Sequence, residues 1–140
     1  MNIGILYFSG TGNTKWVVEY IHEKTVEMGI QSEVFNIEKY NKKEILEYDN
    51  ILIAHPIYGA NIPPIVLKNI NNYVFNKNAK ISIITTFGYV NALGIFKESR
   101  DLGLKIYSYI NVKMFNNITT KKLKSKILSI DERKKLRKKI

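Results

Sequence analysis

The sequence predicts an α/β fold, in which a doubly wound, five-stranded parallel sheet carries helices on both faces. Five short apolar segments rich in β-forming residues alternate with segments of helical periodicity. Parallel strands are joined by right-handed crossovers, so this alternation builds one continuous sheet. The length of 140 residues and the 45% share of hydrophobic residues suit one domain with a substantial core. We therefore expect a single domain over residues 1–140, whose C-terminal part from residue 113 onward is a basic helical tail.

The five expected strands differ in their exposure. The first and third are short, almost wholly apolar runs, which are typical of strands covered on both faces. The second has polar residues between apolar ones, which indicates an exposed side. We place the strands at Ile3–Phe8, Ser32–Ile37, Ile51–Ala54, Lys80–Thr86 and Lys105–Val112.

Helices fill the intervals between these strands. In the first, apolar residues recur at helical spacing with charged residues between them, and Gly29 ends the helix. Pro63 and Pro64 open a later helix, because proline is favoured in the first helical turn. The helices are expected at Asn13–Met28, at Lys42–Tyr48, from Pro63 onward, and from the end of the loop Phe87–Leu93 to Asp101.

The most informative segment joins the first strand to the first helix. Its two glycines let the backbone approach an anion closely. Its short polar side chains add hydroxyl and amide donors beside the N–H groups at the start of the helix, and the next charged residue is the cation Lys15. The segment predicts a phosphate-binding loop that consists of Ser9, Gly10, Thr11, Gly12, Asn13 and Thr14.

Two better-known phosphate loops do not fit this segment. A Walker A loop needs four residues between its first glycine and a Gly-Lys-Ser/Thr triplet, and this spacing does not occur in the chain. A dinucleotide-binding loop needs a small residue three positions after its second glycine, where this chain has Lys15. We therefore expect neither ATP hydrolysis nor dinucleotide binding here.

The composition narrows the chemistry further. The chain has no cysteine, which excludes disulfides, a thiolate nucleophile and cysteine-ligated metal centres. Any redox chemistry must therefore use a bound cofactor. No apolar run approaches the roughly 20 residues of a membrane helix, and the N-terminus enters a strand without a leader pattern. We expect a cytoplasmic protein that does not associate with membranes.

The net charge of +10 is concentrated at the C-terminus. Residues 113–140 hold 11 lysines and arginines against 2 acidic residues, whereas residues 1–112 hold 11 against 10. Within the tail, Asp131 and Glu132 precede a run of basic residues, an order that the helix dipole favours. The tail is either a solvated helix or a docking surface for an acidic partner. Nucleic-acid binding is not expected, because the tail lacks interleaved aromatics and any known recognition module.

Over roughly Met1–Met114 these residues resemble the flavodoxin family. The segment Ser9–Thr14 matches, position by position, the loop that wraps the FMN phosphate in that family. The resemblance implies the strand order 2-1-3-4-5, FMN as the cofactor, and a monomer. Within the family, the chain is most similar to domains that precede a cysteine-rich ferredoxin domain in some anaerobes, although it has no such domain itself.

Two further loops look like those that flank the flavin ring in this family. The loop after the third strand supplies Pro56, Ile57, Tyr58, Gly59 and Asn61, with Tyr58 or Ile57 against the ring and Gly59 near flavin N5. The loop after the fourth strand supplies Thr86, Phe87, Gly88, Tyr89 and Asn91, with Phe87 or Tyr89 as the aromatic candidate. A flat ring needs apolar faces and backbone groups at its polar edge, and both loops offer them. Ligands of such sheets lie at the carboxyl ends of strands, where these loops begin.

Our leading hypothesis is an FMN-binding electron carrier that passes single electrons between a reductase and a partner enzyme. The loops contain no obvious nucleophile or acid–base pair, and we expect no catalytic residue and no metal site. One alternative is a flavin-dependent oxidoreductase on the same scaffold, directed at quinones or porphyrins or serving a ribonucleotide reductase. Another is a binding module for haem, another tetrapyrrole or an acidic protein. His55 is a conceivable haem ligand, but a hydrogen-bonded structural histidine is the favoured interpretation.

Overall fold

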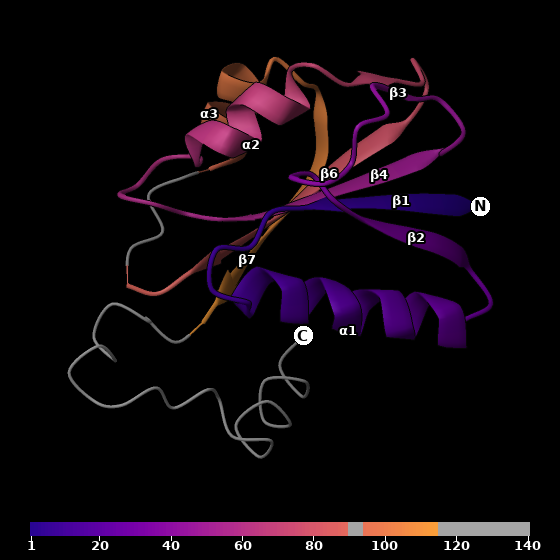
Figure 1. Cartoon of the computed structure of the whole chain (residues 1–140), viewed down its shortest axis with the longest axis horizontal. Helices are drawn as coiled ribbons and strands as arrows, with labels where there is room; N and C mark the ends of the chain where they lie inside the picture. Colours follow the sequence, from indigo (N-terminus) through magenta and orange to yellow (C-terminus); the bar gives the residue numbers. More distant parts are fainter. Residues whose placement is uncertain (90–93, 115–140) are drawn as a thin grey trace.

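The computed structural model describes residues 1–89 and 94–114, and its centre is a five-stranded parallel sheet (Figure 1). The order of the strands is β2-β1-β4-β6-β7. Counted among these five alone, this is the expected order 2-1-3-4-5, so the predicted sheet is confirmed. The strands are β1 (Asn2–Tyr7), β2 (Gln31–Asn36), β4 (Asn50–Pro56), β6 (Lys80–Phe87) and β7 (Ile106–Lys113).

Helices cover both faces of this sheet, as predicted for a doubly wound fold. Helix α1 (Asn13–Glu27) packs along β1, β2 and β4 on one face. Helices α2 (Pro64–Ile70) and α3 (Ile95–Leu102) lie together on the opposite face (Figure 1). Each face therefore has its own hydrophobic core, centred on Ile5 and Val17 under α1, and on Ile53 and Val66 under α2 and α3.

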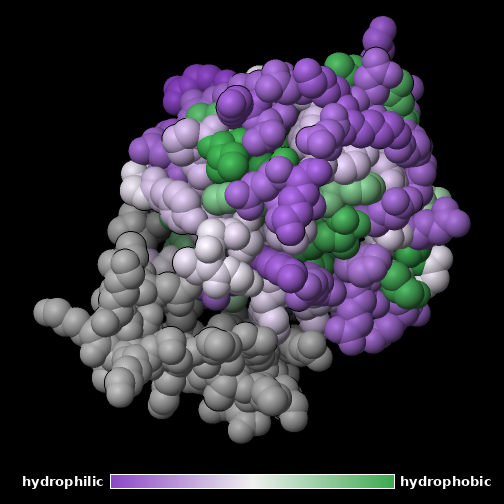
Figure 2. Space-filling view, viewed as in Figure 1, coloured by the Kyte–Doolittle hydropathy of each residue, from purple (hydrophilic) through white to green (hydrophobic). Residues whose placement is uncertain are grey.

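Burial of apolar side chains in these two cores is the main source of stability. On the face shown in Figure 2, hydrophobic residues form small patches separated by hydrophilic ones. None of the helices in the described ranges is both long and apolar enough to cross a membrane.

The prediction of a helix at Lys42–Tyr48 is wrong. These residues contain the short strand β3 (Glu44–Ile45), which pairs in parallel with β5 (Val74–Phe75) in a second, two-stranded sheet. The Val74 N–H donates to the Lys43 carbonyl at 2.7 Å. The local pattern favours a helix, but pairing with a segment 30 residues away and burial of Ile45 decide the conformation.

The other predicted helices are found within one or two residues of their expected ends. The expected helix that begins at Asp131 lies outside the described residues.

Candidate functional site

Three loops meet at the carboxyl ends of β1, β4 and β6, and Thr86 joins them. The Thr86 hydroxyl lies 2.7 Å from that of Thr14, at the start of α1, and both side chains are buried. The Thr86 carbonyl accepts the N–H of Ile57 at 2.9 Å, and Pro56 is its register partner across the sheet. The segments that the sequence assigns to one site are therefore close together.

The first loop is shaped for an anion. The Gly12 N–H donates to the Ser9 hydroxyl oxygen at 3.1 Å, which closes the turn. Gly12 has a φ of 95°, in the left-handed region that favours glycine. The Trp16 N–H then donates to the Gly12 carbonyl and begins α1, whose first turn contains no acidic residue. An N-terminal helix turn presents backbone N–H groups and positive potential, so this loop suits a phosphate.

The side chain of Tyr58 lies over this first loop. A β-carbon placed on Gly10 would be 2.2 Å from the Tyr58 hydroxyl, so Gly10 leaves the room that this ring occupies. The Tyr58 ring also packs edge-on against Phe8, with 6.3 Å between the centroids. Tyr58 is 46% exposed, and burial raises the pKa of its hydroxyl. The ring thus connects the predicted phosphate loop to the predicted flavin-flanking loop.

The second loop contains a tight two-residue turn. Tyr58 and Asn61 exchange two backbone hydrogen bonds of 3.0 Å, and the residues between them, Gly59 and Ala60, have φ angles of 54° and 61°. Ala60 is the only non-glycine residue of the described chain with a positive φ. The Asn61 side-chain amide donates to the Gly59 carbonyl at 2.9 Å, which stabilises this turn.

The third loop begins at the end of β6. Phe87 is half-buried, and its carbonyl accepts the N–H of Met114 at 2.7 Å. Gly88 is half-buried, whereas Tyr89 is 70% exposed. Asn91 lies outside the described residues. All other predicted site residues therefore lie at or near the carboxyl ends of β1, β4 and β6.

Glu98, which is not among the residues predicted from the sequence, lies behind the second and third loops. His55 and Glu98 are both 0% exposed, and the His55 Nε2 lies 3.0 Å from a Glu98 carboxylate oxygen. His55 is hydrogen-bonded within the fold, as the favoured interpretation expects. One signal could have revealed Glu98: Ile95, Glu98 and Leu102 follow each other at helical spacing, which places this carboxylate on the inward face of α3.

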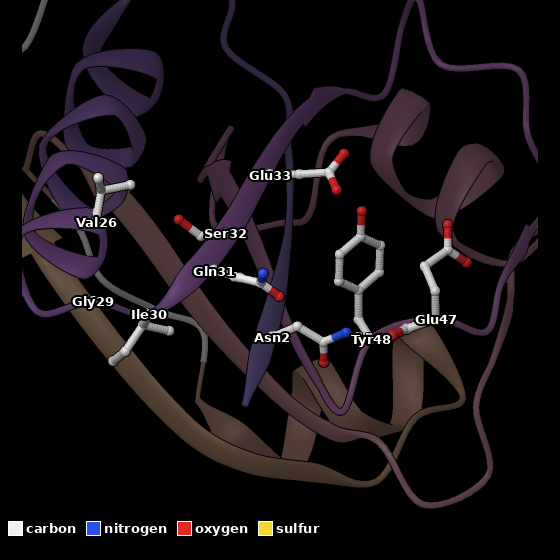
Figure 3. Close-up of a pocket in the computed structure, with 9 residues that line it drawn as sticks. All are labelled: Asn2, Val26, Gly29, Ile30, Gln31, Ser32, Glu33, Glu47 and Tyr48. Atoms are coloured by element: carbon white, nitrogen blue, oxygen red, sulfur yellow. Dashed lines mark hydrogen bonds between the residues drawn. The ribbon is translucent and has the colours of Figure 1, made fainter.

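A groove of about 630 Å³ lies at the opposite, amino end of the sheet (Figure 3). Several of its polar groups already have hydrogen-bond partners in the protein. The Asn2 side chain accepts the Asp49 N–H and donates to the Glu47 carbonyl. The Tyr48 hydroxyl points towards the Glu33 carboxylate, and burial together with this hydrogen bond raises the pKa of Tyr48. The groove thus offers two carboxylates and no anion-binding loop.

Comparisons with known proteins agree on a family. A family described as "Flavodoxin domain" matches residues 4–126. A flavodoxin from Clostridium saccharobutylicum is 38% identical over 63 residues, which are 44% of this chain and 39% of that protein. The match thus spans about two fifths of this curated relative.

Solved structures share the fold. The flavodoxin of Streptococcus pneumoniae TIGR4 superposes with a TM-score of 0.67 at 14% identity, and all of each chain is covered. The Flv1 flavodiiron core from Synechocystis sp. PCC6803 superposes with a TM-score of 0.65 at 19% identity, over 100% of this chain and 37% of that one.

Proposed function

This chain belongs to the flavodoxin family, and on that premise we propose that it binds FMN at the carboxyl ends of β1, β4 and β6 and carries single electrons. Membership of the family implies a flavin cofactor and a redox role. The observation that carries the proposal is the joining of three loops at Thr86, since it sets a phosphate-type loop beside two loops suited to a flat ring.

The residues present fit this cofactor. The neutral donors of Ser9–Thr14 and the N-terminal turn of α1 would hold the phosphate. Tyr58 and Phe87 would lie against the ring, and the backbone around Gly59 would meet its polar edge. Bound flavin would supply the electron transfer, while these loops would set its potential and limit its contact with water.

Electron transfer fits this site better than conversion of a substrate. The ionisable pair behind the loops, His55 and Glu98, is fully buried and has no access to a substrate. The loop Pro56–Pro63 contains no Asp, Glu or His, and neither does Thr86–Leu93. Such loops repel a negatively charged, reduced flavin less than acidic loops would, so we expect a less negative potential for the second one-electron step.

We further propose that the basic C-terminal residues steer an acidic redox partner to this protein. The support is the sequence charge alone, 11 basic against 2 acidic residues after Val112. Deleting residues 131–140 should leave FMN binding intact and slow electron transfer to an acidic partner. The loss should fade at high salt, where charges more than about 8–10 Å apart are screened. A rate loss that is independent of salt would contradict steering.

A spectrum of the purified full chain tests the cofactor. We expect a yellow protein that releases FMN on denaturation, or a colourless one that becomes yellow with added FMN. A chain that takes up no FMN would refute the proposal. Steady-state turnover with NAD(P)H and a small quinone, without a partner protein, would instead identify an oxidoreductase.

A further inference from the structure

A histidine and a glutamate are buried together between the sheet and α3. His55 lies near the carboxyl end of β4, and Glu98 lies in the first turn of α3. Both side chains are 0% exposed, and Nε2 is 3.0 Å from Oε2. Burying an ionisable group is unfavourable unless it is paired and hydrogen-bonded, so the partners of each atom decide the charge of the pair.

The hydrogen-bond partners determine how many protons this pair holds. The other ring nitrogen of His55, Nδ1, lies 2.9 Å from the Pro56 carbonyl oxygen, which can only accept. Nδ1 must therefore carry a proton. A second proton must lie between Nε2 and the carboxylate, because two lone pairs would otherwise face each other. The pair thus holds two protons and is neutral overall, as imidazolium with carboxylate or as imidazole with carboxylic acid.

Among the residues that the structure describes, few other titratable groups lie around this pair. From β7, the Tyr109 hydroxyl lies 3.5 Å from the second Glu98 oxygen, and burial raises the pKa of Tyr109, which keeps it neutral. From β6, the neighbour is Thr85, the register partner of His55. On α3 itself, Lys97 and Arg100 pair with Asp101 at the surface. Lys68, the one titratable residue of α2, is exposed.

The pair connects the two loops proposed to flank the flavin. His55 immediately precedes the loop Pro56–Pro63, and its ring contacts the first carbonyl of that loop. Glu98 belongs to the helix that follows the other loop, and its own N–H donates to the Gly94 carbonyl at 3.0 Å. A contact between these side chains therefore fixes the position of α3 relative to the end of β4.

We propose that His55 and Glu98 form a buried clamp that shares one proton beyond those of a free imidazole and carboxylate, and that positions both flavin-flanking loops. The positioning role rests on the proposed function, whereas the shared proton does not. The two parts therefore need separate tests, one without flavin and one with it.

The shared proton is tested by the unfolding of the flavin-free full chain. In Glu98→Gln, the amide donates to Nε2 while Nδ1–H still donates to Pro56, so the folded variant holds one proton fewer than the wild type. The two unfolded chains hold the same number of protons, because a free glutamate is ionised above about pH 5.5. The ratio of the folding constants, wild type to Glu98→Gln, should therefore fall about tenfold per pH unit between about pH 5.5 and 8.

Asp101→Asn is the matched control for this experiment. It removes a carboxylate from the same helix, but Asp101 lies at the surface, where its interactions with Lys97 and Arg100 lower its pKa, so it stays ionised in both states. The ratio of wild type to this control should not change with pH. A ratio of wild type to Glu98→Gln that is also constant would overturn the shared proton.

Should Glu98→Gln fail to fold, NMR of the wild-type chain tests the second proton through the ¹⁵N shift of His55 Nε2 and the ¹³C shift of the Glu98 carboxyl. The chain has two histidines, and His22, with its Nδ1 2.7 Å from the Ser32 hydroxyl, is the internal comparison. Nδ1 carries a proton with or without the clamp, so the clamp requires that a second proton stays on Nε2 or on the Glu98 carboxyl of the folded chain up to about pH 8. A folded protein with an unprotonated Nε2 and an ionised Glu98 would contradict it.

The positioning role is tested by flavin affinity at a pH where each variant is folded. Glu98→Ala removes the clamp between α3 and β4. It should weaken the binding of FMN and of riboflavin by the same factor, at least about tenfold, because the ring-flanking loops contact both ligands. Glu98→Gln should restore most of the affinity, and Asp101→Asn should leave it unchanged. A folded Glu98→Ala chain with wild-type affinity would overturn the positioning role.

A wild-type chain that binds neither flavin would refute the proposed function, while the pH test would still decide on the shared proton.

Discussion

The two ends of the central sheet differ in their chemistry, and the carboxyl end has the donors expected of the flavin site that we propose. At the amino end, the groove of about 630 Å³ is lined by Glu33 and Glu47, and the Tyr48 hydroxyl points towards Glu33 (Figure 3). At the carboxyl end, the turn of Ser9–Thr14 and the start of α1 present neutral donors. The arrangement of hydrogen-bond donors therefore favours the carboxyl end as the flavin site.

The largest expected effect is on the phosphate loop. Thr11→Ala and Asn13→Ala should each weaken FMN binding by about 1.5–3 kcal/mol, since each removes a hydrogen bond to a charged group. Riboflavin, which has no phosphate, should bind both variants as it binds the wild type. Isothermal titration with both ligands measures this. Equal losses for the two ligands would mean that this loop does not hold the phosphate.

A change at the amino end should instead affect stability alone. A β-carbon on Gly4 would lie 2.8 Å from the buried ring of Tyr48, so Gly4→Ala forces that ring to move. Overpacking of this kind typically lowers the free energy of unfolding by about 1–3 kcal/mol. Urea unfolding should show the loss, while the FMN affinity of the folded chain stays unchanged. A lower FMN affinity would contradict this expectation, because it would show that packing at the amino end affects the flavin site.

A smaller effect is expected at the rim of the carboxyl end. Asn61→Asp places a carboxylate beside the Gly59–Ala60 turn and should lower the potential of the second one-electron step of bound flavin. The ammonium of Lys97 lies 3.4 Å from the Asn61 oxygen and offsets part of the added charge. We therefore expect a shift in potential equivalent to about 1 kcal/mol or less. Potentiometric titration measures the shift. An unchanged or raised potential would show that Asn61 is remote from the ring.

The smallest effect is expected for a charge change in the amino-end groove, which serves as a control for the changes at the carboxyl end. Glu47→Gln changes the charge of the amino-end groove and breaks only a surface ion pair with Lys42. Such pairs contribute about 0–1 kcal/mol. FMN affinity and potential should both stay at their wild-type values, and a clear change in either would place the cofactor at the wrong end of the sheet.

The sequence predicted the parts of the molecule that depend on local patterns. The five strands, helix α1 and the loop Ser9–Thr14 follow from periodicity, capping and glycine spacing, which nearby residues determine. The strand β3 was missed because its hydrogen bonds come from Val74–Phe75, and no local pattern records that pairing. Glu98 was missed for a similar reason, since its partner His55 is 43 residues away and the two meet only in the folded chain.

We propose above all that the carboxyl end of the sheet binds FMN through its phosphate. The most direct measurement is the titration of the flavin-free wild-type chain with FMN and with riboflavin under identical conditions. We expect FMN to bind at least about tenfold more tightly, because each of several hydrogen bonds to a charged phosphate should contribute about 1.5–3 kcal/mol. Equal affinities for the two flavins, or no binding of either, would contradict it.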